Sequence, residues 1–222
     1  TSTIYDATCP LVTKVHKEVI RRQKQNHQVI LIGHAGHPEV EGTLGQSNDI
    51  KNITLVESIS DVETLDFPTG IDISYTTQTT LSVDDTREIV ESLQSKFPQI
   101  QSPKKSDICY ATQNRQDSVK AIINNSDMLL VLGSKNSSNS NRLREIAEKN
   151  KKPAYLIDGA NDINPAWLKG INSIGITAGA SAPEILVQEV VSYLLDNGAN
   201  EVVEVSGANE SVHFPVPNTL RV

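Results

Sequence analysis

The chain contains two cysteines, Cys9 and Cys109, and each stands just before a predicted helix. The N-terminus of a helix favours negative charge, and therefore the thiolate that binds metals. Thiolates are the ligands that iron–sulfur clusters require, whereas the C-x-x-C spacing typical of structural zinc is absent. The alternative is two buried side chains that act as small hydrophobes. The two cysteines occupy equivalent places in an internal repeat described below, which favours a shared role as metal ligands. A cluster would need a third ligand from elsewhere.

Groups that can carry protons gather in the segment Gly33–Glu39, which contains His34, His37 and Glu39. A histidine can donate a hydrogen bond to an anion or shuttle a proton near neutral pH, and a glutamate in a closed site can act as general acid or base. Taken alone, the segment is as consistent with a solvated turn. Beside Cys9 it becomes the expected source of protons.

Residues 134–142 form the most unusual stretch, rich in serine and asparagine and charged only at Lys135 and Arg142. Short hydroxyl and amide side chains beside the amides of a helix start can bind an anion. The spacing of a Walker A loop is absent. Residues 177–183 form a second loop of small residues, with Ser181 available as a donor. The two loops predict a phosphate or diphosphate site, and the alternative is a pair of ordinary polar turns.

Short β-rich runs alternate with helical stretches, which is typical of a parallel sheet built from βαβ units. Strands are expected at Val29–Ile32, Ile53–Val56, Ile71–Thr76, Met128–Leu132, Ala154–Ile157 and Ser173–Thr177. Helices are expected at Leu11–Gln25, Val83–Phe97, Gln113–Asn124, Asn141–Lys149 and Pro183–Leu195. His16 and His27, on or just after the first helix, are expected to face solvent. Residues 201–205 could form a further strand, followed by an extended tail.

Alignment of the chain against itself reveals a repeat. When Cys9 is placed on Cys109, the loop 33–39 falls on 133–139 and the loop 77–83 falls on 177–183. Each half then runs cysteine, helix, strand, polar loop, strand, polar loop and helix. Ligands of open α/β sheets bind beyond the carboxyl ends of the strands, where all these loops lie. We therefore expect an α/β protein of two repeated parallel-sheet lobes around a central cleft.

Composition places limits on the partners of this protein. The 222 residues carry a net charge of −7, with 37% hydrophobic and 21% charged side chains. An acidic chain is poorly suited to nucleic acid, whose phosphates attract basic faces. The longest apolar runs, such as Met128–Leu132, fall far short of the roughly 20 residues of a membrane span. No signal peptide opens the sequence and Thr1 is not a start methionine, so we expect a cytoplasmic protein with a segment missing upstream.

The motifs together closely resemble the 4-hydroxy-3-methylbut-2-enyl diphosphate reductase family, which acts last in the methylerythritol phosphate route to isoprenoids. They are Asp6–Val12, Gly33–Gly42, Thr77–Asp85, Asp107–Thr112, Gly133–Arg142 and Thr177–Pro183, and they occur in the family's order over nearly the whole chain. The resemblance implies a three-lobed α/β protein whose central cavity holds a [4Fe-4S] cluster. It also implies reductive removal of the substrate hydroxyl as water, with two electrons from ferredoxin or flavodoxin.

Site residues follow from the resemblance position by position. Cys9 and Cys109 match the second and third cysteines that bind the cluster, and Glu39 matches the proton donor. Two groups match residues that contact the substrate: His37 and Thr79 at its body, and Ser137, Ser138, Asn139 and Ser181 at its diphosphate.

The chain departs from the family in lacking its first lobe, which carries the first cluster cysteine and two further substrate histidines. Residues 1–100 would be the second lobe, 101–196 the third, and 197–222 a tail expected to pack on the missing lobe. Such a fragment is expected to be poorly active or inactive alone. Two other interpretations stay open: a metal-free module that binds a phosphorylated metabolite, and an inactive fragment that binds the product diphosphate weakly.

Overall fold

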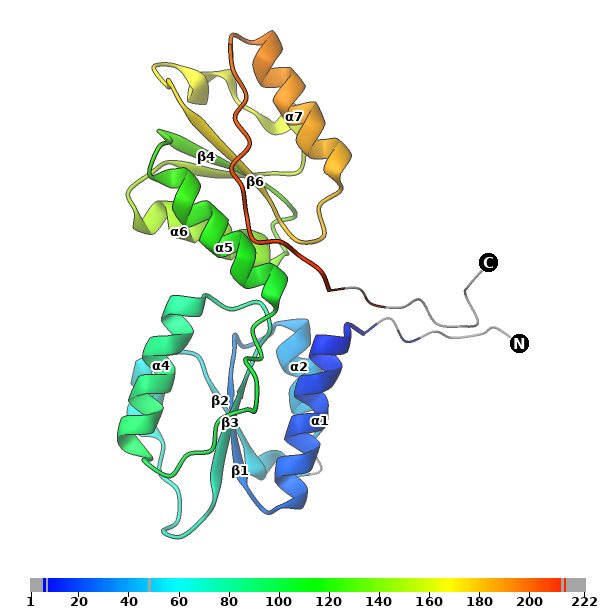
Figure 1. Ribbon diagram of the computed structural model, residues 1–222. Helices are drawn as coiled ribbons and strands as arrows, with labels where there is room; N and C mark the ends of the chain where they lie inside the picture. The colour runs from blue at the N-terminus through cyan, green and yellow to red at the C-terminus, as the bar shows by residue number, and fades with distance from the viewer. Residues whose placement is uncertain (1–5, 7, 48, 213, 215–222) are drawn as a thin grey trace, which may run out of the picture. The chain divides into compact units, whose positions relative to one another are not determined.

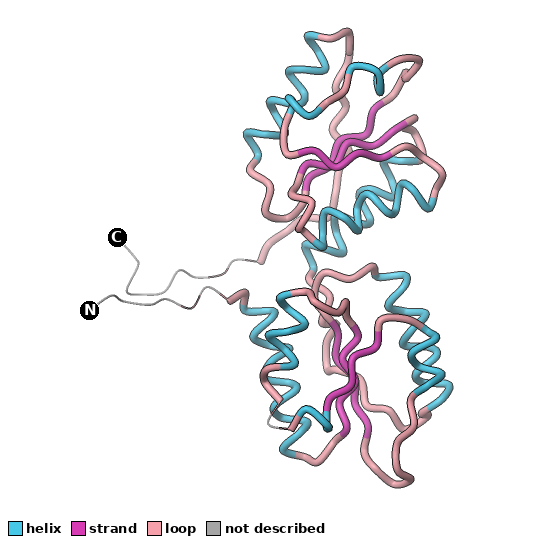
Figure 2. The backbone as a smooth tube through the Cα atoms, turned by 180° about the vertical axis from the view of Figure 1, so that it is seen from behind, coloured by secondary structure: helices cyan, strands magenta, loops and turns pink. Residues whose placement is uncertain are grey.

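The computed structural model describes residues 6, 8–47, 49–212 and 214. It divides the chain into two compact units. Unit 1 comprises the described residues up to 79, residues 84–109 and the described residues from 209 onward, and unit 2 comprises residues 80–83 and 110–208. Each unit contains one three-stranded parallel sheet with helices on both faces (Figures 1 and 2). The predicted α/β class and repeated parallel sheets are therefore confirmed.

The sheet of unit 1 has the order β2-β1-β3. Its strands are β1 (Gln28–Ile32), β2 (Ile53–Val56) and β3 (Ile73–Thr77), and its helices are α1 (Pro10–Lys24), α2 (Pro38–Leu44), α3 (Ile59–Thr64) and α4 (Val83–Lys96). Every residue of β1 is buried, as expected for a central parallel strand covered on both faces.

The sheet of unit 2 has the equivalent order β5-β4-β6. Its strands are β4 (Met128–Leu132), β5 (Ala154–Ile157) and β6 (Ile174–Ala178), and its helices are α5 (Tyr110–Ile123), α6 (Ser138–Lys149) and α7 (Glu184–Asp196). A shift of 100 residues places β1 on β4, and a shift of 101 places β3 on β6. The repeat seen in the sequence is thus a repeat of topology.

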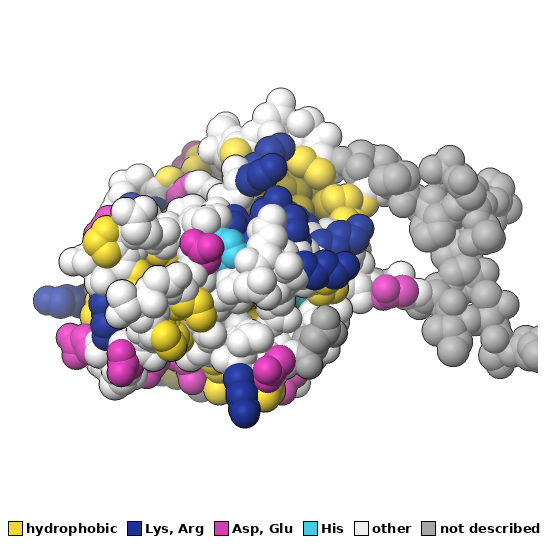
Figure 3. Space-filling view, turned by 90° about the horizontal axis from the view of Figure 1, so that it is seen from below, with side chains coloured by type: hydrophobic (Ala, Val, Ile, Leu, Met, Phe, Trp, Pro, Cys, Tyr) yellow, Lys and Arg dark blue, Asp and Glu magenta, His cyan; other side chains and the backbone are white. Residues whose placement is uncertain are grey.

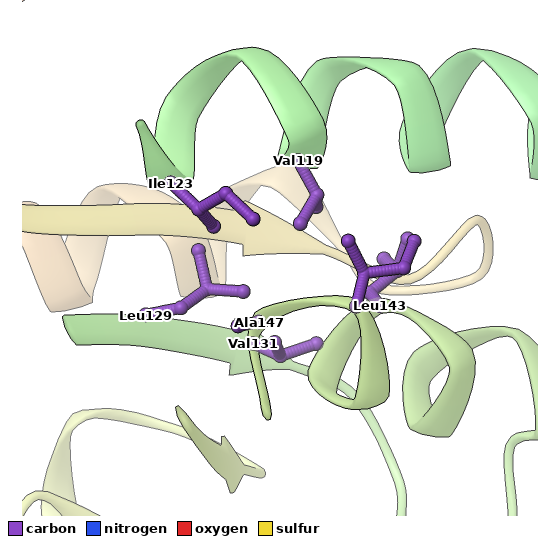
Figure 4. Packing of buried hydrophobic residues seen from close by; sticks show 7 residues of the cluster. Val119, Ile123, Leu129, Val131, Leu143 and Ala147 are labelled. Carbon is purple, nitrogen blue, oxygen red and sulfur yellow. The ribbon is translucent and has the colours of Figure 1, made fainter. Parts of the chain in front are cut away.

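Alternation along β4 explains how unit 2 builds a core on each face of its sheet. Leu129 and Val131 pack with α5 and α6, in a cluster that includes Val119 and Leu143 (Figure 4). Met128, Leu130 and Leu132 belong to a second cluster, which includes Val190 and Leu194 of α7. Successive side chains of a strand point to opposite faces, so one apolar strand serves both clusters.

Four helix predictions need correction. Helix α3 was not predicted, and α5 begins at Tyr110 and not at Gln113. Helix α2 was not predicted, because it lies inside the polar stretch after Gly33 and has only seven residues. Helix α6 begins at Ser138 and not at Asn141, because Ser137 caps it by accepting a hydrogen bond from the Ser140 amide. In both units a helix therefore starts within the loop where the sequence predicted binding groups.

Three further expectations were wrong. His27 is only 6% exposed and His16 is partly buried, although both were expected to face solvent. Residues 201–205 form no strand, and Val203 there is 71% exposed. The last residues of the predicted tail, 215–222, lie outside the described part of the chain.

Basic side chains gather on part of the surface shown in Figure 3, with acidic side chains around them. The last turn of α1 carries Arg21, Arg22 and Lys24, where positive charge is favoured by the helix dipole.

In the described part of the chain, no helix has the length and apolar character needed to cross a bilayer.

Candidate active site

Both cysteines lie in unit 1, each directly before the first residue of a helix. Cys9 precedes α1, is exposed and makes no side-chain capping bond. Cys109 precedes α5, is partly exposed, and donates its backbone N–H to the carbonyl of Thr79 at 2.9 Å. Both thiols are free. Neither is the fully buried hydrophobe of the alternative interpretation, so both remain available as ligands.

Thr79, two residues after the end of β3, connects two other predicted site residues, Cys109 and Glu39. Its carbonyl accepts from Cys109, its N–H donates to Oε1 of Glu39 at 2.7 Å, and its hydroxyl donates to Oε2 of Glu39 at 3.0 Å. Thr79 is 5% exposed. A carboxyl group in the first turn of α2 is thereby held beside the segment that carries a cysteine.

Burial raises the pKa of Glu39 above its ordinary value, and the negative charge of Asp107 adds to this effect. The two hydrogen bonds from Thr79 act in the opposite direction and limit the rise. A hydroxyl can both donate and accept, so Thr79 can serve the ionised and the protonated carboxyl alike. Glu39 is therefore able to hold a proton and to release it without losing its position.

His37 caps α2, and its Nδ1 accepts the N–H of Glu39 at 3.1 Å. Burial, with a contribution from His34, lowers the pKa of His37 and favours the neutral ring. A neutral imidazole that accepts at Nδ1 carries its proton on Nε2. The ring thus offers one donor in addition to its role at the helix start.

The serine- and asparagine-rich segment opens α6 in unit 2. Ser137 is the N-cap, and the Ser138 hydroxyl donates to the carbonyl of Thr80 at 3.3 Å. Asn139 is 5% exposed, and among the described residues neither the nitrogen nor the oxygen of its side-chain amide has a hydrogen-bond partner. An unsatisfied buried amide costs about 1–3 kcal/mol. A ligand bearing acceptor oxygens at this helix start would accept from the amide nitrogen and so remove part of that cost.

Ser140 fixes the geometry of this helix start. A Cβ at Gly133 or at Gly179 would lie 2.2 Å from the Ser140 hydroxyl oxygen, so both strand ends approach that hydroxyl closely. Gly133 also has φ +155, which other residues rarely adopt. Ser140 in turn contacts the hydroxyl of Ser137 at 3.1 Å. Ser181 is exposed in the turn that follows Gly179.

The donor set fits an iron–sulfur cluster in kind, because two free thiols lie in one unit at helix starts. It is incomplete in number. Among the described residues, no group of three or more His, Cys, Asp and Glu side chains is placed to hold a metal ion.

Comparison with known proteins identifies the family. The family model described as LytB protein matches residues 1–195. The chain belongs to this family. A 4-hydroxy-3-methylbut-2-enyl diphosphate reductase of Ruthia magnifica is 69% identical over 220 residues, which are 99% of this chain and 71% of that protein. The same enzyme of Pseudomonas aeruginosa is 56% identical over 99% of this chain and 70% of its own length.

A solved member of the LytB family has the same fold. The structure of E-1-hydroxy-2-methyl-but-2-enyl-4-diphosphate reductase from Plasmodium falciparum aligns with a TM-score of 0.82 at 40% identity. The alignment covers 90% of this chain and 65% of that one. The chain thus spans about two thirds of the length of a solved relative and about 70% of the curated ones.

Sequence reasoning assigned no role to three residues of this LytB-family site. Lys14 was not singled out, and Asp107 was considered only as part of the motif around Cys109. Ser140 was one of several similar serines. Each acts on residues far away in the sequence, and no local pattern predicts such contacts.

Proposed function

We propose that this protein takes part in the reductive dehydroxylation of 4-hydroxy-3-methylbut-2-enyl diphosphate to isopentenyl and dimethylallyl diphosphates. The reaction takes up two electrons and two protons. It breaks the allylic C–O bond, forms a C–H bond and releases water. Membership of the LytB family supports the reaction. The observation that carries it is the hydrogen bonding of Thr79 to both the Glu39 carboxyl and the Cys109 backbone.

Cys9 and Cys109 are the proposed ligands of a [4Fe-4S] cluster, with a third thiolate from outside this pair. When bound, such a cluster supplies electrons and a Lewis-acidic iron. The electrons come, in this proposal, from ferredoxin or flavodoxin.

Glu39 is the proposed proton donor. Its raised pKa keeps it protonated to a higher pH than an ordinary carboxyl group, and Thr79 holds it in place. A proton delivered to the departing hydroxyl oxygen turns it into water, a far better leaving group. His37 and Thr79 are proposed to contact the substrate and to orient it toward Glu39.

Ser137, Ser138, Asn139 and Ser181 are proposed to bind the diphosphate. The start of α6 favours anions through its amides and dipole, and the unpartnered Asn139 amide adds a donor. Binding through neutral donors holds the ligand without neutralising its charge.

We further propose that residues 1–100 and 101–196 are the second and third lobes of the family, that 197–222 packs on another lobe, and that the protein is cytoplasmic.

The test is product formation by the complete gene product, purified without oxygen and supplied with a chemical reductant. We expect a brown protein that forms both products, and loss of activity in Cys9→Ser and in Cys109→Ser. A colourless preparation that is fully active would overturn the proposal.

A second candidate, a metal-free module for a phosphorylated metabolite, rests on the start of α6, which needs no cysteine. Iron quantitation separates the two candidates. Diphosphate binding by protein that never takes up iron under anaerobic reconstitution favours the second.

A further inference from the structure

Asp107 is a buried carboxylate that the proposed reaction does not use. Its side chain is fully shielded from solvent. One oxygen accepts from the Thr76 hydroxyl at 2.7 Å and from the Thr77 N–H at 3.1 Å. Both threonines belong to the end of β3, so Asp107 attaches the segment before Cys109 to that strand. These hydrogen bonds lower the cost of burying the carboxylate, and an opposite charge beside it lowers that cost further.

Lys14 supplies the compensating charge from α1. Its ammonium lies 3.0 Å from the other oxygen of Asp107 and donates to the carbonyls of Lys105 and Ser106 at 2.9 and 2.8 Å. Lys14 stands about one helical turn after Cys9, whose carbonyl accepts the first bond of α1, from Thr13. The helix that follows one cysteine is thus bound to the segment that precedes the other by Lys14 near its start, and by Arg22 near its end, which donates to the Gln101 side chain and to the Ser102 carbonyl.

We infer that the Lys14–Asp107 pair is a brace that sets the separation of Cys9 and Cys109, and that both are positioning residues for the cluster. This rests on the proposed function. The Cys109 segment is held to the end of β3 by Asp107 and to Thr79, two residues after β3, by the Cys109 N–H, whereas Lys14 links the start of the Cys9 helix to Asp107. Loss of Lys14 removes the link nearest Cys9 and leaves the Cys109 segment attached to β3, while Arg22 still holds the far end of α1 to residues 101 and 102.

The test uses a bifunctional maleimide of short span on the 222-residue chain, in which Cys9 and Cys109 are the two cysteines. Mass spectrometry distinguishes one bridging molecule from two separate adducts. We expect efficient bridging in the wild type and at least a five-fold lower yield in Lys14→Met, with unchanged far-UV circular dichroism. Alkylation by a monofunctional maleimide should be equal in the two proteins, so that a change of thiol accessibility is excluded.

Lys14→Arg retains a cation and should recover most of the bridging, which a general loss of helix stability would not explain. Lys17→Met, an exposed position on the same helix, is the matched control and should bridge as the wild type does. If Lys14→Met does not fold, the bridging yield of Asp107→Asn tests the brace instead. The asparagine amide has the shape of the carboxylate but no charge to bind the Lys14 ammonium. We expect the same five-fold loss there.

The outcomes distinguish failure of the brace from failure of the proposed function on which it rests. Wild-type bridging with equal bridging in the folded Lys14 or Asp107 variant overturns the brace and leaves the proposed function standing. Failure of the wild type to bridge, with both thiols singly labelled, contradicts a shared cluster site and overturns both.

Discussion

The most instructive comparison is between the starts of α2 and α6, which occupy equivalent places in the two units. Glu39 in unit 1 corresponds to Asn139 in unit 2, and Thr79 corresponds to Gly179 under the same shift of 100 residues. Glu39 is bound by the amide and hydroxyl of Thr79, whereas the side-chain amide of Asn139 has no hydrogen-bond partner in the described part of the chain. Replacement of the threonine by glycine removes the hydroxyl that could have satisfied the amide.

The difference shows how one scaffold can serve two kinds of chemistry. Gly33 and Gly133 both end a central strand against the next helix, at Val40 in unit 1 and at Ser140 in unit 2. The topology is repeated, whereas the side chains at the carboxyl ends of the strands differ. Unit 1 presents thiols and a proton-bearing carboxyl, while unit 2 presents neutral donors suited to an anion.

The largest expected effect concerns proton donation by Glu39 in unit 1. Glu39→Gln retains the shape of the side chain and a partner for Thr79 but cannot donate a carboxyl proton. We expect turnover to fall by about 10²–10⁴-fold, the usual contribution of general acid catalysis, with iron content and diphosphate binding retained. Steady-state kinetics under anaerobic conditions measure it. Glu41→Gln, an exposed acid of the same helix, is the control, and equal turnover in both variants would refute the role of Glu39.

The next effect tests the close packing in unit 2. Gly133→Ala places a methyl group 2.2 Å from the Ser140 hydroxyl oxygen at a backbone angle that alanine rarely adopts. We expect a loss of unfolding free energy of about 2–3 kcal/mol, measured by urea denaturation. Gly159→Ala meets no atom within 4 Å and serves as control. Equal stability of the two variants would show that the α6 start does not depend on this contact.

A smaller effect concerns the side-chain amide of Asn139 and its proposed bond to the diphosphate. Asn139→Ala removes an unsatisfied buried group, so the free protein should be as stable as the wild type or slightly more stable. Affinity for inorganic diphosphate should fall about ten-fold, as expected for the loss of a hydrogen bond to a charged group. Calorimetry measures both quantities. Reduced stability with unchanged affinity would give Asn139 a structural role instead.

The smallest effect is a dependence of stability on pH. The pKa of Glu39 is raised in the folded chain, so the carboxyl binds its proton more tightly there than in the unfolded chain. Its contribution to stability is complete below the ordinary glutamate pKa and is lost as the pH rises through the raised value. The Tm of Glu39→Gln minus the Tm of the wild type should therefore increase as the pH rises through this range. Parallel Tm curves would contradict the direction of the shift.

Much of the fold could be predicted from the sequence, because apolar β-branched runs and the shift of 100 residues are local or periodic signals. Strand Met128–Leu132 was predicted with its observed bounds. The starts of α2 and α6 could not be placed, because serine, asparagine and glycine are typical of loops as well as of helix caps.

The candidate site was less accessible to sequence reasoning than the fold. The site residues of unit 1 were selected by motif, but the bond between Glu39 and Thr79 joins positions 40 residues apart. The contact of Lys14 with Asp107 spans 93 positions, from 14 to 107. Such contacts depend on how helices pack on the sheet, and no periodicity of the chain encodes that.

The most direct test of the account is the iron content per chain after anaerobic reconstitution of the complete gene product and three variants. If Cys9 and Cys109 hold the same cluster, Cys9→Ser, Cys109→Ser and the double variant should all fall to one common low level. Retention of iron in either single variant, with a further loss only in the double variant, would mean that the two thiols serve separate sites, and the account would be wrong.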